Sequence, residues 1–351
     1  MAFASLTDLG WRPFFQQQLS VEEAESMRVA RVIEVQRGRI RIDDGSDERD
    51  VVLGGRWFQG DAETRPTVGD WVVLDAGNAS VARVLDRESV FRRLVAGDRS
   101  DVQLIAANVD ILFVVTSANE EFNVSRLERY LTLALDVGVQ PVVVVTKVDL
   151  IATPDAFLEA AKSVRSGLPV ELVNALDAAT LAPVRAWCSR GQTVALLGSS
   201  GVGKSTLVNT LLGSAAQATA AIRESDSSGR HTTSHRSLHR LPDGGLLLDV
   251  PGMRELKIGD VQAGVEQVFD DIAALAARCR FSDCTHGNEP DCAVQAALES
   301  GELSERRLAS FRKLEREQRW ASETIAERHQ RGRAFSKRVR QHQKLSHKKR
   351  D

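Results

Sequence analysis

Residues 198–205 read GSSGVGKS and have the spacing of a phosphate-binding loop, G-x-x-x-x-G-K-[ST]. The loop follows the apolar run TVALL and precedes the helix-like run STLVNTLL. Its glycines let backbone N–H groups point at a phosphate, next to the start of a helix. We expect Lys204 to bridge the β- and γ-phosphates and Ser205 to bind Mg²⁺, and we predict both to be catalytic. The predicted nucleotide-binding residues here are Gly198, Ser199, Ser200, Gly201, Val202, Gly203, Lys204, Ser205 and Thr206.

A second motif, TKVD at residues 146–149, ends another apolar run and resembles the guanine-reading N-K-x-D. We predict that Asp149 accepts hydrogen bonds from N1–H and the exocyclic amine of guanine, which adenine cannot donate there. Lys147 would pack along the ring. Thr146 replaces the usual Asn, which puts nucleotide affinity in question more than base specificity. The segment NAL at residues 174–176 is a weaker candidate for a base-contacting loop.

Two further segments are expected to contact Mg²⁺ and the γ-phosphate. DVPG at residues 249–252 follows the strand-like run LLLD, so we expect Asp249 to act on Mg²⁺ indirectly and the Gly252 N–H to meet the γ-phosphate. In GRHTT, either Thr232 or Thr233 would supply a hydroxyl that senses Mg²⁺ and the γ-phosphate. We favour Thr232, so the predicted magnesium ligands are Ser205 and Thr232.

These motifs stand in a rotated order, with the base-reading segment ahead of the phosphate-binding loop. A circular permutation preserves a site in space because sheet packing does not depend on where the termini lie. It also places the segment with Asp249 and Gly252 directly before the C-terminal part of the chain. We therefore expect nucleotide state to act on that part through a short covalent link.

Cys279, Cys284, His286 and Cys292 lie within fourteen residues and suit a tetrahedral Zn²⁺ ion. Four protein ligands indicate a closed, structural site. The alternative is a group of buried free thiols. Cys188, the remaining cysteine, is interpreted as a core residue.

Composition is typical of a globular protein, with 42% hydrophobic and 27% charged residues, no apolar run long enough for a membrane span and no secretory signal. We therefore expect a cytoplasmic protein. The net charge is only −2, but residues 328–350 contain ten Lys or Arg and no acidic residue. Such a run is either a solvated tail or a contact for a polyanion, above all RNA.

The element pattern changes twice along the chain. Residues 27–94 predict short strands of a β-barrel, among them VVLGGRWF at residues 51–58, and the OB-fold and an SH3-like barrel both fit. Strands alternate with helices from residue 101, which predicts a parallel sheet covered on both faces. Beyond residue 262 the chain is expected to be helical. The predicted boundaries are 1–100, 101–262 and 263–351. Barrel residues that could contact nucleic acid, or be ordinary surface and core, are Arg39, Arg41, Arg56, Trp57 and Phe58.

The order TKVD, GSSGVGKS, GRHTT, DVPG, followed by CRFSDCTHGNEPDCAV and preceded by VGDWV, resembles the RsgA (YjeQ) family of small-subunit-dependent GTPases over essentially the whole chain. The resemblance implies a multidomain α/β protein with an N-terminal OB-fold, a circularly permuted P-loop GTPase domain and a C-terminal helical zinc-binding domain. It implies GTP hydrolysis stimulated by the small ribosomal subunit in its late maturation, with rRNA as a partner. It also implies zinc on the four Cys and His residues. We expect a monomer.

The resemblance leaves the water-orienting residue open. Ras-like enzymes place Gln after D-x-x-G, whereas Met253 stands here and cannot orient water, so we expect intrinsic turnover at or below about 10⁻² s⁻¹. His231 either orients water once ribosomal contacts order its loop, or is a loop residue that touches RNA. Other interpretations are a P-loop ATPase, a non-catalytic RNA-binding scaffold, and a GTPase directed at tRNA or mRNA.

Overall fold

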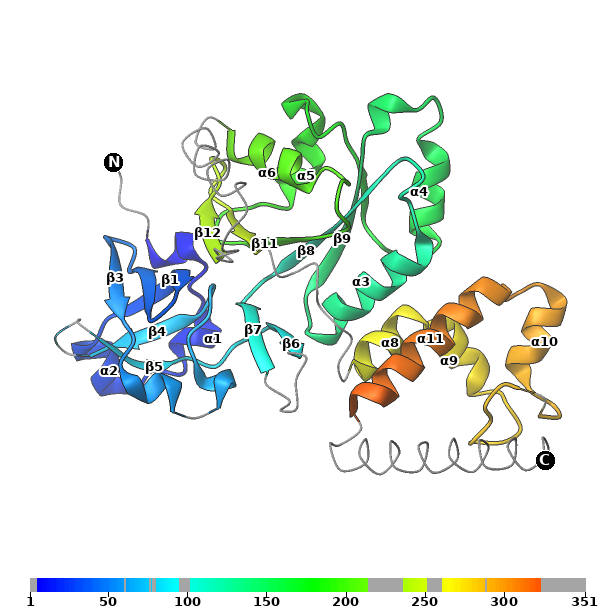
Figure 1. Cartoon of the computed structure of the whole chain (residues 1–351), viewed down its shortest axis with the longest axis horizontal. Coiled ribbons are helices and arrows are strands. Elements are labelled where there is room, and N and C mark those ends of the chain that lie inside the picture. Colours follow the sequence, from blue (N-terminus) through cyan, green and yellow to red (C-terminus); the bar gives the residue numbers. More distant parts are fainter. Residues whose placement is uncertain are drawn as a thin grey trace, which may run out of the picture.

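The computed structural model describes residues 5–59, 61–75, 77, 80–94, 102–213, 236–250, 261–287 and 289–322 of the 351. Figure 1 shows three parts: strands near the N-terminus, a central sheet with helices, and a group of C-terminal helices. Within the described residues, no helix is both long and apolar enough to cross a membrane.

The central part is a mostly parallel sheet, as the alternation of strands and helices predicts. Its strand order is β10-β9-β8-β11-β13-β12, in which only β12 runs antiparallel to its neighbour β13. The strands are β8 (Ile111–Ser117), β9 (Gln140–Thr146), β10 (Val170–Leu172), β11 (Thr193–Leu197), β12 (Arg236–Arg240) and β13 (Leu246–Asp249). The helices are α3 (Val124–Asp136), α4 (Asp155–Lys162), α5 (Ala182–Ala186) and α6 (Lys204–Leu212).

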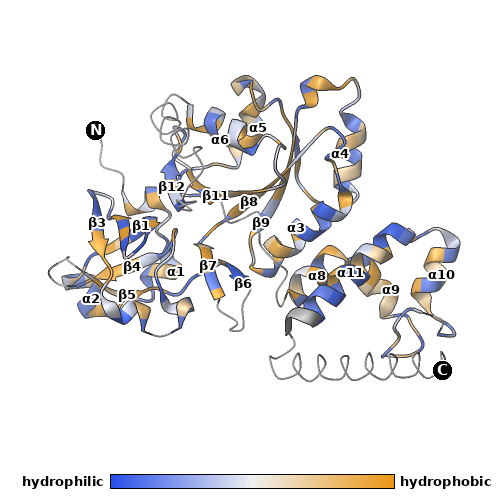
Figure 2. Cartoon of the chain, viewed as in Figure 1, coloured by the Kyte–Doolittle hydropathy of each residue, from blue (hydrophilic) through white to orange (hydrophobic). Residues whose placement is uncertain are grey.

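Alternate residues of the buried strands pack against helices on opposite faces, because successive strand side chains point to opposite sides. Leu112 and Val114 of β8 share a core with α3, whereas Ile111 and Phe113 share a core with α5 and α6. Figure 2 shows hydrophobic residues concentrated in these central strands, while α3 carries both kinds of residue. Helices therefore cover both faces of the sheet, which confirms the expected layering.

The N-terminal strands run in the order β3-β2-β1-β4-β5 and enclose their own apolar core. They are β1 (Val29–Gln36), β2 (Arg39–Asp43), β3 (Glu48–Val52), β4 (Trp71–Leu74) and β5 (Val81–Val84). Three helical elements precede them: a 3₁₀ turn (Leu6–Leu9), α1 (Pro13–Gln16) and α2 (Val21–Ser26). Two more 3₁₀ turns, Gly55–Phe58 and Ala62–Thr64, join β3 to β4.

Two features of this region differ from the sequence prediction. The strand expected to run through residues 51–58 ends at Val52, because Gly54 and Gly55 interrupt it and a 3₁₀ turn follows. Arg56 in that turn donates to the backbone carbonyls of Val81 and Ala82 of β5, which fixes the turn against the strands. In addition, β6 (Val90–Leu94) and β7 (Val102–Ala107) form an unexpected antiparallel pair that spans the boundary predicted at residue 100.

The N-terminal strands and the central sheet form one continuous sheet. The bulge between Val32 and Glu34 lets the first half of β1 pair with β4 and its second half pair with β12. This continuity was not predicted, because the pattern of residues 27–94 and the pattern from residue 101 onward each predict a separate sheet.

A buried arginine fastens the same junction. Arg31 of β1 is 1% exposed and donates to the carbonyl oxygens of Leu9, Gly69 and Asn108, which belong to three different parts of the chain. Its guanidinium also lies 5.6 Å from the ring of Trp71. Burial lowers the pKa of Arg31 to about 10, so the group stays charged at neutral pH.

The C-terminal helices are α8 (Gln262–Val268), α9 (Asp270–Ala276), α10 (Ala293–Ser300) and α11 (Glu305–Ser322). Of these, α8 and α11 pack on α3. A Cβ on Gly264 of α8 would lie 2.1 Å from the carbonyl oxygen of Thr132, so only glycine permits this close approach to α3. Glu128 of α3 is fully buried and is paired with Arg306 (3.0 Å) and Arg307 (2.9 Å) of α11. The central part and the C-terminal helices thus share a buried ionic contact.

Candidate nucleotide and metal sites

The loop after β11 has the backbone of a phosphate cradle. Gly201 and Gly203 take φ values of 79° and 92°, which non-glycine residues avoid. A Cβ on Gly198 would lie 2.2 Å from the carbonyl oxygen of Val115, so glycine is required there too. Lys204 opens α6, and its Nζ donates to the carbonyl oxygens of Gly198 (2.8 Å) and Ser199. The ammonium group therefore lies inside the loop that a phosphate would occupy.

The TKVD segment lies at the same edge of the sheet as this loop. β9 ends at Thr146, and β8 separates β9 from β11 with all three strands parallel, so their carboxyl ends meet. Lys147 adopts a left-handed conformation with φ of 60°, and Asp149 lies exposed in the 3₁₀ turn Val148–Leu150. The carboxylate is therefore open to solvent beside the loop, as a group that reads a base edge must be.

Thr146 connects the two motifs directly. Its side chain is fully buried, and its Oγ1 lies 2.6 Å from the carbonyl oxygen of Val202 and 3.1 Å from that of Thr116. Because a hydroxyl carries one proton, the shorter contact to Val202 is the better donor geometry. The residue that departs from the usual motif thus holds the end of β9 against the phosphate-binding loop.

Two more candidates lie along this edge. The segment from Asn174 to Leu176 follows β10, and the Asn174 carboxamide accepts a bond of 3.0 Å from the Leu176 N–H. The Thr210 hydroxyl of α6 donates to the carbonyl oxygen of Ala175 (2.7 Å), so α6 supports this loop. Asp249 ends β13 and is half-buried. His231, Thr232, Thr233 and Gly252, as well as residues 328–350, lie outside the described residues.

Sequence reasoning missed one cation beside the phosphate-binding loop. Arg126 of α3 donates from Nη1 to the hydroxyl of Ser199 at 2.5 Å. No pattern marked Arg126, because the contact joins residues 73 positions apart and depends on how α3 packs.

The four residues of the Cys/His cluster converge. Their ligand atoms lie within 4.8 Å of one another. Cys279 Sγ is 3.9 Å from Cys292 Sγ, and each lies 3.6 Å from His286 Nδ1. A tetrahedral ion with metal–sulfur bonds of about 2.3 Å would place sulfurs about 3.8 Å apart and sulfur and nitrogen about 3.6 Å apart. The cluster therefore fits a four-coordinate metal ion.

The electrostatics of the thiols also suit a cation. Although partial burial opposes it, the backbone N–H groups of Ala293 and Val294 at the start of α10 lower the pKa of Cys279. Desolvation, together with the neighbouring thiols of Cys292 and Cys279, raises the pKa of Cys284 to about 11. Three thiols this close cannot all ionise readily unless a positive ion offsets their charge.

Surrounding residues hold the metal-binding loop in shape. Glu289 accepts from the N–H groups of Thr285 (3.1 Å) and Gly287 (2.6 Å) and from the Thr285 hydroxyl. The hydroxyl bond is the main reason that the pKa of Glu289 falls to about 2. Arg312 of α11 donates to the carbonyl oxygen of His286, so the loop is fixed to the helix that contacts α3. Such surrounding bonds orient metal ligands.

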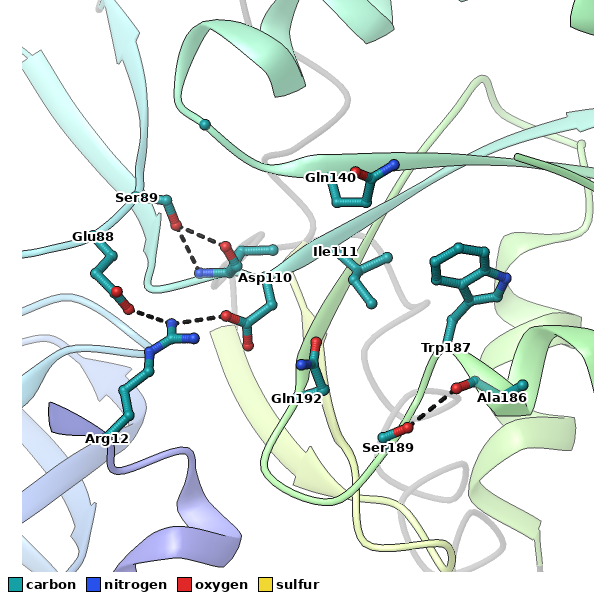
Figure 3. Close-up of a pocket in the computed structure, with 12 residues that line it drawn as sticks. Arg12, Glu88, Ser89, Asp110, Ile111, Gln140, Ala186, Trp187, Ser189 and Gln192 are labelled. Carbon is teal, nitrogen blue, oxygen red and sulfur yellow. Dashed lines mark hydrogen bonds and ion pairs between the residues drawn. The ribbon is translucent and has the colours of Figure 1, made fainter. Parts of the chain in front are cut away.

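A cavity of about 510 Å³ lies at the opposite edge of the sheet, by the amino ends of β8 and β9 (Figure 3). Arg12, on its wall, pairs with Glu88 and with Asp110 (2.7 Å), and Asp110 also accepts from the Thr193 N–H at 2.7 Å. These contacts anchor the N-terminal segment to the sheet. The cavity is remote from the phosphate-binding loop and is not the predicted nucleotide site.

Known proteins are similar to this chain in sequence and in fold. The sequence profile of the RsgA GTPase family matches residues 84–259. A relative from Vibrio vulnificus (strain CMCP6), named small ribosomal subunit biogenesis GTPase RsgA 2, is 46% identical over 336 residues, covering 96% of this chain and 94% of that protein. Small ribosomal subunit biogenesis GTPase RsgA from Mesorhizobium japonicum is 47% identical over 88% of this chain and 89% of its own length.

Solved structures agree with this relationship. The crystal structure of YloQ, described as a circularly permuted GTPase, superposes with a TM-score of 0.59 at 26% identity, covering 85% of this chain and 97% of that one. YjeQ from Thermotoga maritima has the same fold, with a TM-score of 0.61 at 24% identity over 82% of this chain and 97% of that one. The similarity extends well beyond the nucleotide motifs, so this chain belongs to the RsgA GTPase family and is a GTP hydrolase.

Proposed function

We propose that the chain hydrolyses GTP during late maturation of the small ribosomal subunit, and that binding of this subunit stimulates hydrolysis. The observation that carries the proposal is the bond from Thr146 to Val202, which brings a base-reading segment and a phosphate-binding loop to one site. The relatives named as small ribosomal subunit biogenesis GTPases support the choice of partner. We further propose a cytoplasmic monomer whose partners include rRNA.

Each residue of the nucleotide site has its own proposed role. Asp149 selects guanine through its carboxylate, and Lys147 lies along the ring. The backbone of residues 198–206 binds the phosphates, and Lys204 leaves its intraloop carbonyls to bridge the β- and γ-phosphates. Ser205 and Thr232 would hold Mg²⁺, with Asp249 acting indirectly, and a bound ion would supply positive charge against the phosphates. Thr233 and Gly252 would contact the γ-phosphate, and His231 would orient water.

The remaining parts act as supports and as RNA contacts. Strands β1–β5 have the pairing order of an OB-fold, and we propose that they form one that binds rRNA. Arg39 and Arg41 on β2 face Asp50 at 3.7 and 3.8 Å, and Arg56 donates to carbonyls of β5, so the exposed ring of Phe58 is the most available of these candidate contacts. The Cys/His cluster would hold one structural Zn²⁺, since soft thiolates, an imidazole and a closed tetrahedral set favour that ion. The proposed domains are 1–100, 101–262 and 263–351.

Phosphate release tests the proposal. Wild-type protein should release phosphate slowly from GTP, and purified small ribosomal subunits should accelerate this release, whereas large subunits should not. Ser205→Ala should remove both rates, since it removes a proposed Mg²⁺ ligand. Equal hydrolysis of ATP would favour another class of P-loop enzyme. A rate that small subunits leave unchanged would favour a scaffold role.

A separate prediction concerns Thr146. Thr146→Val keeps the shape of the side chain but leaves buried carbonyl oxygens without its donor. We expect affinity for GTP and GDP to fall alike, by about 5- to 30-fold. The preference for guanine over adenine should persist, because Asp149 is unchanged. Isothermal titration with GDP, GTP analogue and ADP measures both quantities.

Thr193→Val is a matched control for Thr146→Val. Thr193 is fully buried at the start of β11, and among the described residues its hydroxyl has no hydrogen-bond partner. Nucleotide affinity should therefore stay at the wild-type value in this variant. If Thr146→Val behaved the same way, the connection between the two motifs would not matter for binding.

A further inference from the structure

Helix α3 brings a second cation to the phosphate-binding loop. Arg126 lies in the first turn of α3, where the Asn123 side chain caps the helix by accepting from the Arg126 N–H at 2.9 Å. The Arg126 guanidinium donates to the Ser199 hydroxyl at 2.5 Å. The carbonyl oxygen of the same Ser199 accepts from Lys204. Two positive groups thus meet at the second residue of the loop, one from α6 and one from α3.

The present partners of Arg126 are weak compared with a phosphate. A serine hydroxyl is neutral, and the nearest carboxylate, on Glu121, is 3.4 Å away and about half exposed. A guanidinium presents several N–H groups in a fixed plane that matches phosphate oxygens, and such charge-assisted bonds are stronger than those to neutral acceptors. An anion at the loop would therefore compete successfully for Arg126.

The position of Arg126 identifies the phosphate. Lysine at the end of such a loop reaches the β- and γ-phosphates. Because Lys204 and Arg126 donate to the same residue, Ser199, the guanidinium lies beside the group that is expected to reach the β- and γ-phosphates. We propose that Arg126 is an arginine supplied by the chain itself that binds the γ-phosphate of GTP and neutralises the charge that grows there during hydrolysis. This inference rests on the proposed nucleotide site and adds a catalytic residue to it.

Helix α3 is held firmly enough for this role. Two residues beyond Arg126, buried Glu128 pairs with Arg306 and Arg307, and Arg307 also binds Asp271 at 2.9 Å. These contacts fix the helix from its far side. A charge that is already in place before the reaction stabilises the transition state without reorganisation.

The test compares Arg126→Ala and Arg126→Lys with wild type. Arg126→Ala should lower the single-turnover rate of GTP hydrolysis by roughly 10²- to 10³-fold. It should weaken binding of a non-hydrolysable GTP analogue, while GDP affinity changes less than about threefold, because GDP has no γ-phosphate. Arg126→Lys should recover part of the rate, since it keeps the charge but not the planar geometry.

Arg129→Ala is the matched control, because it removes an arginine from the same helix away from the phosphate-binding loop. It should keep the wild-type rate and affinities. An unchanged rate in Arg126→Ala would overturn the proposal, and so would an equal loss of GTP-analogue and GDP affinity, which would indicate a structural role. If wild type itself failed to hydrolyse GTP, the proposed function would fail, while the ratio of analogue to GDP affinity would still decide whether Arg126 binds the γ-phosphate.

Discussion

Asp149→Asn is expected to change the base preference of the chain from guanosine to xanthosine triphosphate. The Asp149 carboxylate can accept from both N1–H and the 2-amino group of guanine. Asparagine offers one acceptor and one donor, so its amide would face the guanine amine with a donor. The bond to N1–H loses its charge assistance and the bond to the 2-amino group is replaced by two opposed donors, so GTP affinity should fall by about 10²- to 10⁴-fold. Xanthine carries a carbonyl at position 2, which accepts from that amide.

Competition binding measures this exchange. A labelled GTP analogue is displaced by GTP, XTP or ATP, and the order of displacement should invert between wild type and Asp149→Asn for the first two. Asp155→Asn is a control with the same loss of charge at an exposed position of α4, and it should keep the wild-type order. If GTP affinity survived Asp149→Asn, the base would not be read by Asp149, and the nucleotide would have to lie elsewhere along the edge.

The parts of the fold that were predictable are those in which local pattern and tertiary environment agree. The strands β8, β9 and β11 are apolar runs bounded by loops, and their burial on both faces leaves no other arrangement for such residues. The phosphate-binding loop is equally local, because its glycines and Lys204 lie within eight residues. Sequence alone therefore identified the edge of the sheet at which chemistry is expected.

The features that were not predictable depend on contacts between distant residues. Arg31 lies inside a strand, where a charged residue is expected to face water, yet three carbonyls from separate segments bury it. Thr146 lacks the amide of the usual Asn, so sequence alone predicts a weaker nucleotide contact. Its bond to Val202 depends on how the end of β9 packs against the phosphate-binding loop. The strand expected to extend to Phe58 ends at Val52, because Gly54 and Gly55 interrupt it. The glycines are a local signal for this end, but the apolar residues around them predict a continuous strand.

Loss of the metal from the Cys/His cluster is expected to loosen the C-terminal helices as a unit. Cys279 follows α9 and Cys292 immediately precedes α10, so the ion would connect the end of one helix to the start of the next. Structural zinc sites contribute apparent binding free energies of about 10–16 kcal/mol to folding. Cys292→Ala removes one of three thiolates, and we expect it to lower the metal content well below one ion per chain and to expose residues 277–303 to protease.

The effect should extend to the nucleotide-binding part. α11 carries Arg306 and Arg307, and its Arg312 is fixed to the metal-binding loop through the His286 carbonyl. If α11 moves away, Glu128 is left as a buried charge without its partners, a situation that destabilises proteins by about 3–5 kcal/mol. Cys292→Ala should therefore also lower the melting temperature of the part that binds GDP, although no cluster residue lies near the phosphate-binding loop.

Cys188→Ala is the matched control for Cys292→Ala. Cys188 is 1% exposed and Cys292 6%, so both variants remove a buried sulfur, but Cys188 lies on the far face of the central sheet in the core of α5 and α6. Cys188→Ala should keep the wild-type metal content and the wild-type protease pattern, with only the stability loss of a small core truncation. Metal analysis, limited proteolysis and thermal unfolding with GDP separate the two variants. A Cys292→Ala protein with full metal content would show that the predicted cluster does not hold the metal. C-terminal helices that stay intact without metal would show that α11 is held by its ionic contacts with α3 alone.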